Sequence, residues 1–335
     1  MFEIKFTTAT PLCQIDEGGE VIKIKRMPVI VSVDGNAPKT LRTPIYTANG
    51  FRGMIRRVGY ELILEALFKK GSDHKAIGGP TNFHLHNAGG GNNFQGQPIA
   101  IENKVRELSP LVSVFGASLA VEGKLIVDNF IPKRETGTGD YDYCYGVVAS
   151  GEREGSLYSN IVAERTFVKK DDMLDHTGNA QYMEEKEVSD WEVFASDNQA
   201  LRAQTKDKSD KERVKKETIK HIQSQEYVIP GVEFYGSIEE KIPFTDLEKG
   251  MMIRILERAS KKRLGAGANT GHGKVEYSIS FMNGCSLNTA VKQPNGITVT
   301  TNLQLNEEGN RCVGIFDGWL ENITEENIQL DKILI

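Results

Sequence analysis

The residues best suited to hold a ligand lie in the stretch 261–274, which reads KKRLGAGANTGHGK. It places four glycines within nine residues and has basic residues at both ends. Glycine adds no side-chain bulk, and closely spaced backbone N–H groups attract anions, so this loop can lie flat against a phosphodiester backbone. A flexible surface turn is the alternative. The candidate ligands are Lys262, Arg263, Asn269, Thr270, His272 and Lys274, with the backbone of Gly265 and Gly267.

The order of elements around this loop excludes the common nucleotide-binding motifs. An amphipathic helix pattern precedes the loop, and the alternation of apolar and polar residues after it predicts a strand. A P-loop needs the reverse order and a Ser or Thr after its lysine, whereas Val275 follows Lys274. A dinucleotide fingerprint fails as well, because no helix N-terminus follows to hold a pyrophosphate.

A second group of candidate phosphate ligands lies at the start of a helix predicted at 49–70. Asn49 can cap this helix, and Arg52, Arg56 and Arg57 follow on the side opposite its apolar stripe. Basic residues in the first turns oppose the helix dipole, whereas the N-terminal amides attract anions. A bound phosphate resolves this conflict, although a solvated helix face is the more common explanation of such arginines.

Composition and side-chain spacing limit the other functions. The net charge of −5 argues against a generic basic nucleic-acid binder, but not against one whose cations share a face. His84 and His86 have metal-like spacing without a third ligand nearby, so we predict no metal and no cofactor. Four scattered cysteines and the lack of a signal peptide or membrane span predict a cytoplasmic protein with reduced thiols.

The elements that position these residues form a βαββαβ order once the insertions are set aside. This order predicts an α+β, ferredoxin-like fold, as in RNA-recognition modules, with one antiparallel sheet and both helices on one face. Thr245 and Glu248 form a capping box for the second helix. The predicted strands are 2–8, 124–130, 227–240 and 274–282, and the helices are 51–69 and 246–262.

Long insertions interrupt this core, and we treat residues 1–335 as a single elaborated domain. The Gly- and Asn-rich stretch 71–110 is predicted to form no packed element. The polar stretch 132–224 contains a basic run in which Lys215 and Lys216 are expected to contact nucleic acid weakly, as mobile charges. Residues 283–335 are predicted to extend the core with a strand at 297–305.

Three segments resemble the RAMP superfamily of CRISPR-associated proteins. They are the helix start Thr43–Arg57, the Phe-Gly segment Val114–Ser118 that leads into 123–128, and the glycine-rich loop Leu264–Lys274. Their order and spacing match the family over about residues 1–282, although Asn49 stands where the family commonly has serine. Within the superfamily, the chain looks most like the Cas-seven-type backbone subunit of type IV or variant type I systems.

The resemblance implies a palm formed by the ferredoxin-like core, a finger-like insertion at 71–110 and a thumb-like insertion within 132–224. It also implies that copies of the chain stack head to tail along a CRISPR RNA (crRNA). They would present its spacer for pairing with a target DNA or RNA, together with other subunits of the complex. No membrane partner is implied.

The resemblance raises the question of catalysis, because some family members cleave RNA. Type III backbone subunits use an aspartate before the first helix, where this chain has Asp16 and Asp34, but neither stands in a clean copy of that setting. Other members use a histidine general acid, for which His272 is the candidate, with no partner base in view. We therefore predict a non-catalytic RNA-binding subunit, with an endoribonuclease as the alternative.

Overall fold

The computed structural model describes residues 1–17, 21–31, 39–71, 80–89, 96–117, 120–135, 141–143, 147–148, 161–170, 220–282, 284–292 and 298–334. The chain divides into two compact units. The first contains Met1–Glu17, Ile24–Ala163 and Tyr227–Ile335, and the second contains Gly18–Lys23 and Glu164–Glu226. None of the described helices combines the length and apolar character that a membrane span requires.

The first unit is built on an antiparallel sheet whose central strand is β1 (Phe2–Thr8). On one side β1 pairs with β12 (Glu233–Glu240) and on the other with β13 (Val275–Phe281). The strands β6 (Leu125–Val127) and β7 (Ile131–Glu135) pair with the outer side of β12. This strand order confirms the predicted α+β, ferredoxin-like class.

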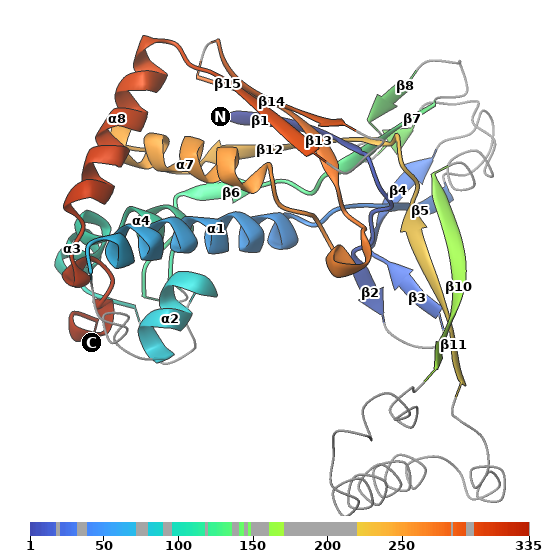
Figure 1. Cartoon of the computed structure of the whole chain (residues 1–335), viewed down its shortest axis with the longest axis horizontal. Coiled ribbons are helices and arrows are strands. Elements are labelled where there is room, and N and C mark those ends of the chain that lie inside the picture. The colour runs from blue at the N-terminus through green and yellow to red at the C-terminus, as the bar shows by residue number, and fades with distance from the viewer. Residues whose placement is uncertain are drawn as a thin grey trace, which may run out of the picture. The chain divides into compact units, whose positions relative to one another are not determined.

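The helices α1 (Ala48–Lys69) and α7 (Asp246–Ala259) cover one face of this sheet, as expected (Figure 1). Alternate residues of each strand point toward the helices, so the apolar side chains of the strands and helices meet in one core. Members of this core include Phe2, Ile4, Phe6, Phe51, Ile55, Phe234, Met252 and Ile255.

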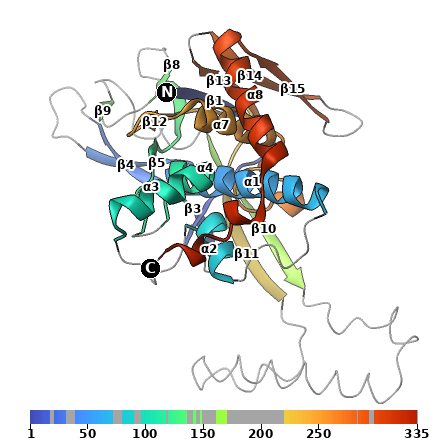
Figure 2. The same cartoon turned by 90° about the vertical axis from the view of Figure 1, so that its left-hand side faces the viewer.

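The C-terminal residues extend the sheet and add a helix beside α7 (Figure 2). β14 (Cys285–Lys292) pairs with β13, and β15 (Thr298–Gln304) pairs with β14. β15 matches the strand predicted at 297–305, whereas β14 was not predicted. α8 (Glu307–Asn322) then packs so closely on α7 that a Cβ at Gly250 would lie 2.0 Å from the Cys312 carbonyl oxygen.

Two predicted strands are shorter than expected. The strand predicted at 227–240 is two strands, β11 (Lys220–Val228) and β12, because Gly231 turns the chain with φ +89° and the Thr8 side chain accepts a hydrogen bond from Val232 N. The strand predicted at 124–130 ends at Val127, and Phe130 instead forms a bridge with Tyr46.

The prediction that 71–110 forms no packed element is wrong. This stretch contains α2 (Pro80–Asn87) and α3 (Ile99–Leu108), and α4 (Pro110–Phe115) begins at its end. Leu85 and Val105 are fully buried in a second apolar cluster that includes Leu330. The glycine- and asparagine-rich composition concealed these helices, because their apolar partners lie far away in the sequence.

The remaining strands form smaller sheets. In the first unit, β4 (Arg26–Val31) pairs with β5 (Lys39–Pro44) and with β9 (Val147–Val148), and β8 (Tyr141–Tyr143) pairs with β7. In the second unit, β11 lies between β10 (Val162–Lys170) and β3 (Val21–Ile24).

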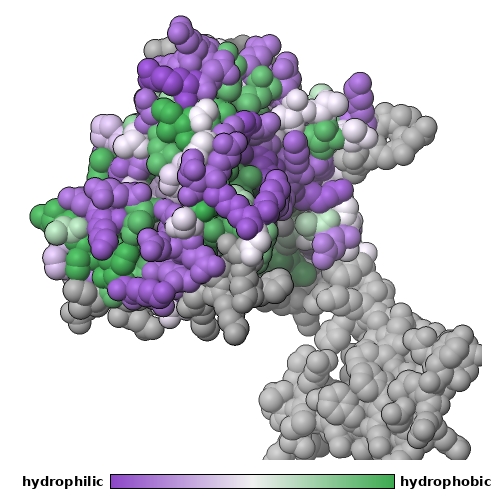
Figure 3. All heavy atoms as spheres, turned by 60° about the vertical axis from the view of Figure 1, so that its left-hand side comes forward, coloured by the Kyte–Doolittle hydropathy of each residue, from purple (hydrophilic) through white to green (hydrophobic). Residues whose placement is uncertain are grey.

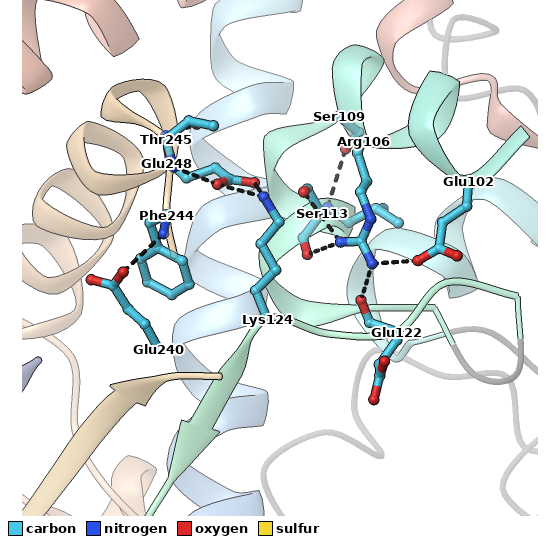
Figure 4. A network of polar contacts seen from close by, with 11 residues as sticks. Glu102, Arg106, Ser109, Ser113, Glu122, Lys124, Glu240, Phe244, Thr245 and Glu248 are labelled. Carbon is cyan, nitrogen blue, oxygen red and sulfur yellow. Dashed lines mark hydrogen bonds and ion pairs between the residues drawn. The ribbon is translucent and has the colours of Figure 1, made fainter. Parts of the chain in front are cut away.

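Two polar networks fix the start of α7 and the packing of α3 on α4 (Figure 4). The predicted capping box is present, and Glu248 also binds the buried Lys124 Nζ at 2.7 and 2.9 Å. Arg106 donates to the backbone carbonyl oxygens of Ser113 and Glu122.

The outer surface is mixed: in the view of Figure 3, apolar patches are separated by hydrophilic side chains.

Candidate nucleic-acid interface

The glycine-rich loop is docked on residues 9–14, which we call the bridging segment. Gly273 N donates to Pro11 O at 2.8 Å, Ala266 N donates to Cys13 O at 2.6 Å, and Lys274 N donates to the Thr10 hydroxyl at 2.8 Å. The bridging segment follows β1 directly, so the loop is tied to the centre of the sheet. The loop is therefore a fixed part of the first unit rather than a free surface turn.

Glycine is required at both ends of this docked loop. Gly265 has φ +72°, and a Cβ there would lie 2.2 Å from Cys13 O. Gly273 has φ +76°, and a Cβ there would lie 1.8 Å from Leu264 O. Both positions combine a left-handed backbone with a close approach, so no other residue fits them.

Most loop amides are used inside the protein, which corrects the expectation of a row of exposed donors. Besides the three bonds to the bridging segment, Thr270 N and His272 N both donate to Gly267 O. The short turn η6 (Ala268–Thr270) forms the tip, and Asn269 and Thr270 are exposed. Within the described loop, the tip amides at 267–269 donate to no backbone carbonyl oxygen.

The start of α1 is capped differently from the prediction. The N-cap residue is Thr47, whose hydroxyl accepts a hydrogen bond from Gly50 N at 3.1 Å, so the proposed Asn49 cap is wrong. Asn129 adds an acceptor for Ala48 N at 2.9 Å. Asn49 is exposed on the first turn, and its side chain is available to a ligand.

The two groups of candidate ligands meet at the start of α1. Tyr46 precedes the N-cap and forms a hydrogen bond with the backbone of Gly265. Gln14, in the bridging segment, forms two hydrogen bonds with Thr47. Burial raises the pKa of Tyr46 to about 12, although the Gly265 bond and the charge of Arg57 act in the opposite direction. Tyr46 is therefore neutral at physiological pH.

Arg56 lies in the interior instead of on an open helix face. Its Nε donates to His86 O at 2.8 Å, and its Nη2 donates to Gly116 O at 2.8 Å and to Leu85 O. Leu85 and His86 belong to the last turn of α2, and Gly116 follows α4. One guanidinium therefore satisfies the C-terminal carbonyls of two helices.

The three arginines of α1 thus have different environments. Arg52 is half-buried and donates to Phe115 O, whereas Arg57 is exposed. Burial lowers the pKa of Arg52, and burial together with the charge of Arg52 lowers the pKa of Arg56 to about 10. Both remain cationic at neutral pH. Sequence periodicity placed Arg56 opposite the apolar stripe, but α2 and α4 cover that side of α1.

The other loop cations are also engaged. Lys262 Nζ lies 2.8 Å from the Glu61 carboxylate, and Arg263 donates to Gly271 O at 2.7 Å. Lys274 is buried and donates to Lys261 O at 3.1 Å, and burial, followed by the charge of Arg263, lowers the pKa of Lys274. The ion pair between Lys262 and Glu61 is exposed to solvent on both sides. Lys262 can therefore leave the Glu61 carboxylate and bind a phosphate at low energetic cost.

Two of the candidate catalytic residues, Asp16 and His272, make contacts inside the protein. Asp16 forms an ion pair with Lys25. The His272 side chain is 5% exposed and packs beside Tyr227, with ring centroids 6.4 Å apart. Asp34 lies outside the described residues, as do the lysines at 215 and 216.

The His84–His86 pair is divided between two environments. His84 is exposed, whereas His86 is fully buried and stacks on Tyr60 with ring centroids 5.3 Å apart. Its Nδ1 donates to Asn82 O at 2.9 Å. Within the described part of the chain, no three potential metal ligands come together. Burial lowers the pKa of His86 to about 4, and the charge of Arg56 contributes to the shift.

This shift predicts that acid destabilises the protein through His86. Between about pH 6.5 and 4, the unfolded chain binds a proton at this histidine and the native chain does not, so stability falls as the pH falls. The loss reaches about 3 kcal/mol at most. Urea unfolding of the wild type and of His86→Phe across this range measures it. An equal pH dependence in both proteins contradicts the prediction.

The sheet face opposite α1 and α7 carries acidic and basic residues side by side. Glu3 and Glu239 are exposed on this face, and the exposed Lys5 lies directly opposite Tyr235. Burial raises the pKa of Tyr235, and the charges of Glu3, Asp128 and Glu239 raise it further. The described residues that combine cations with backbone amides lie at the loop and the start of α1.

Among known proteins, the chain has a structural neighbour but no match in sequence. No protein-family model matches the sequence, and no curated protein matches it either. Among solved structures, the chain is similar to a chain described as "Type IV-B CRISPR Complex", with 14% sequence identity and a TM-score of 0.45. The alignment covers 83% of this chain and 90% of that chain. At this level of similarity, the fold assignment rests on the strand order, and the site rests on its own geometry.

Proposed function

We propose that this protein binds the backbone of an RNA without reading its sequence. The observation that carries the proposal is the junction between the glycine-rich loop and the start of α1. Two elements that independently predict phosphate binding are joined there by the Tyr46–Gly265 and Gln14–Thr47 hydrogen bonds. Backbone amides and cations bind phosphates regardless of base identity, which suits a protein that accepts many RNA sequences.

The exposed groups at this junction are the proposed phosphate ligands. Arg57 supplies a guanidinium for bidentate, charge-assisted hydrogen bonds, and the loop tip supplies amides and the exposed Asn269 side chain. The Thr270 hydroxyl donates to Gly267 O at 2.9 Å and therefore shapes the tip. Asn49 and Lys262 extend this surface along α1 and the end of α7. Arg52 and Arg56 contribute through their positive field and through the packing that they stabilise.

We further propose the role that the family resemblance implies. Copies of the chain lie head to tail along one guide RNA, within a CRISPR complex that pairs the guide with a target. Heterologous contacts of this kind generate a filament, and the RNA sets its length. Sedimentation with RNAs of increasing length therefore gives stepwise growth of the complex. The alternative endoribonuclease would shorten the RNA instead, but the burial of His272 and the Asp16–Lys25 pair disfavour it.

Arg57→Glu tests the site directly. We expect this variant to weaken binding to several unrelated RNAs by similar factors, because Arg57 contacts phosphate and not bases. The slope of log affinity against log salt falls in magnitude by about 0.7–1 for the one lost phosphate contact. Filter binding over a salt series measures both effects.

The matched control is Arg311→Glu, which makes the same charge change on α8. An unchanged affinity and salt slope in Arg57→Glu, or equal losses in both variants, contradicts the proposed site.

A further inference from the structure

We propose that Gln14 is a positioning residue that holds the first turn of α1 in register with the glycine-rich loop. With this register, both elements reach the same RNA backbone at once. This inference rests on the RNA-binding function proposed above. Gln14 was not among the residues selected from the sequence, since a single glutamine in a connecting segment carries no recognisable signal.

Both polar atoms of the Gln14 amide bind one residue. Its Nε2 donates to the Thr47 hydroxyl at 2.6 Å, and its Oε1 accepts a hydrogen bond from Thr47 N at 2.6 Å. Thr47 is the N-cap of α1, so these bonds hold the cap itself. A Cβ at Gly50 would lie 2.5 Å from Gln14 Nε2, so glycine at position 50 gives this side chain its space.

The residue before Gln14 holds the loop. Cys13 is fully buried, and its carbonyl oxygen accepts a hydrogen bond from Ala266 N. Only one peptide unit and one side chain therefore separate the loop from the helix cap. The Tyr46–Gly265 bond closes a second link between the same two elements.

This arrangement has a thermodynamic consequence for a ligand that contacts both elements. When one of the two elements, the start of α1 or the loop, binds a phosphate, the neighbouring phosphates of the same RNA are held close to the other element. Their effective concentration there is high as long as the two elements are fixed relative to each other. If the register is lost, the two elements bind more independently and the total affinity falls. Gln14 does not itself need to touch RNA to produce this effect.

A double-mutant cycle tests the inference with the full chain and a fluorescein-labelled single-stranded RNA of mixed sequence. Arg57→Ala removes a contact on α1, and Asn269→Ala removes one at the exposed tip of the loop. We expect these two changes to be coupled in the wild-type background and additive in the Gln14→Ala background. Gln14→Ala alone should weaken binding about tenfold.

Gln14→Glu supplies the conservative comparison. Its carboxylate can accept hydrogen bonds from both the backbone N–H and the hydroxyl of Thr47, so the register and the coupling should persist. The added negative charge should weaken binding mainly at low salt. Gln304→Ala, an exposed glutamine on β15, is the matched control and should leave affinity and coupling unchanged.

The outcomes separate the two proposals. Coupling that persists in Gln14→Ala, or an unchanged affinity in that variant, overturns the positioning role while RNA binding stands. Coupling lost in both Gln14→Ala and Gln14→Glu also overturns it, because the hydrogen bonds are retained in the second variant. Failure of the wild-type protein to bind RNA overturns the proposed function itself.

Discussion

Replacement of Arg56 by methionine is expected to lower the free energy of unfolding by about 3–5 kcal/mol. Methionine fills most of the volume of the aliphatic stem, but it cannot donate to the carbonyl oxygens of Leu85, His86 and Gly116. These acceptors lie at the C-terminal ends of α2 and α4, where no further helical N–H group can reach them. Urea unfolding followed by circular dichroism measures the loss.

The adjacent residue provides the control for this substitution. Arg57→Met makes the same chemical change at an exposed position, and its effect on stability should stay within about 0.5 kcal/mol. Together, Arg56→Met and Arg57→Met distinguish an effect on stability from an effect on RNA binding. Arg57→Met should weaken RNA binding without unfolding the protein. If Arg56→Met leaves stability unchanged and abolishes RNA binding, Arg56 is a direct ligand and the structural role assigned to it is wrong.

Replacement of Gly265 by alanine is expected to weaken RNA binding at least tenfold, which corresponds to about 1.4 kcal/mol. The added Cβ would lie 2.2 Å from Cys13 O, so the loop must move away from the bridging segment. This movement also breaks the neighbouring Ala266–Cys13 hydrogen bond and the Tyr46–Gly265 contact. Fluorescence anisotropy with labelled RNA measures the affinity.

Gly271→Ala distinguishes the steric clash from backbone strain. Gly271 also has a positive φ, +90°, but no atom lies within 4 Å of a Cβ added there. Alanine at position 271 therefore costs about 1–2 kcal/mol of local strain without displacing the loop from Cys13. Equal losses of affinity in the two variants would show that docking on the bridging segment does not matter for RNA binding.

The sequence predicts the core of this fold well because its patterns are local. Alternation in β1 and β13, and the capping box at Thr245 and Glu248, each depend on residues a few positions apart. The helices α2 and α3 were missed because their burial depends on distant partners such as Leu330. The burial of Asn82 could not be predicted from nearby residues either, because its side chain binds Asp331.

The parts of the candidate site that local patterns indicate were predicted, and the parts that depend on distant residues were not. Glycine spacing identified the loop, and the helix pattern identified the start of α1. Periodicity assigned Arg56 to an open face, because nothing local indicates that α2 and α4 cover that side of α1. The cap was assigned to Asn49 instead of Thr47, two residues earlier, which is the usual uncertainty of a helix boundary. Gln14 gave no signal at all.

The central position of β1 has a consequence for the order of events during synthesis. Phe2 pairs with Ile238 on one side and with Phe281 on the other, so β1 has no neighbouring strand until most of the chain has left the ribosome. Its apolar residues Phe2, Ile4 and Phe6 therefore stay exposed in the nascent chain, where they favour association with other chains. Contacts between residues so far apart in the sequence also form slowly. The loop at 265–274 and the bridging segment meet in the same late step. A nascent chain therefore cannot join the glycine-rich loop to the start of α1 before residues 265–274 have been synthesised.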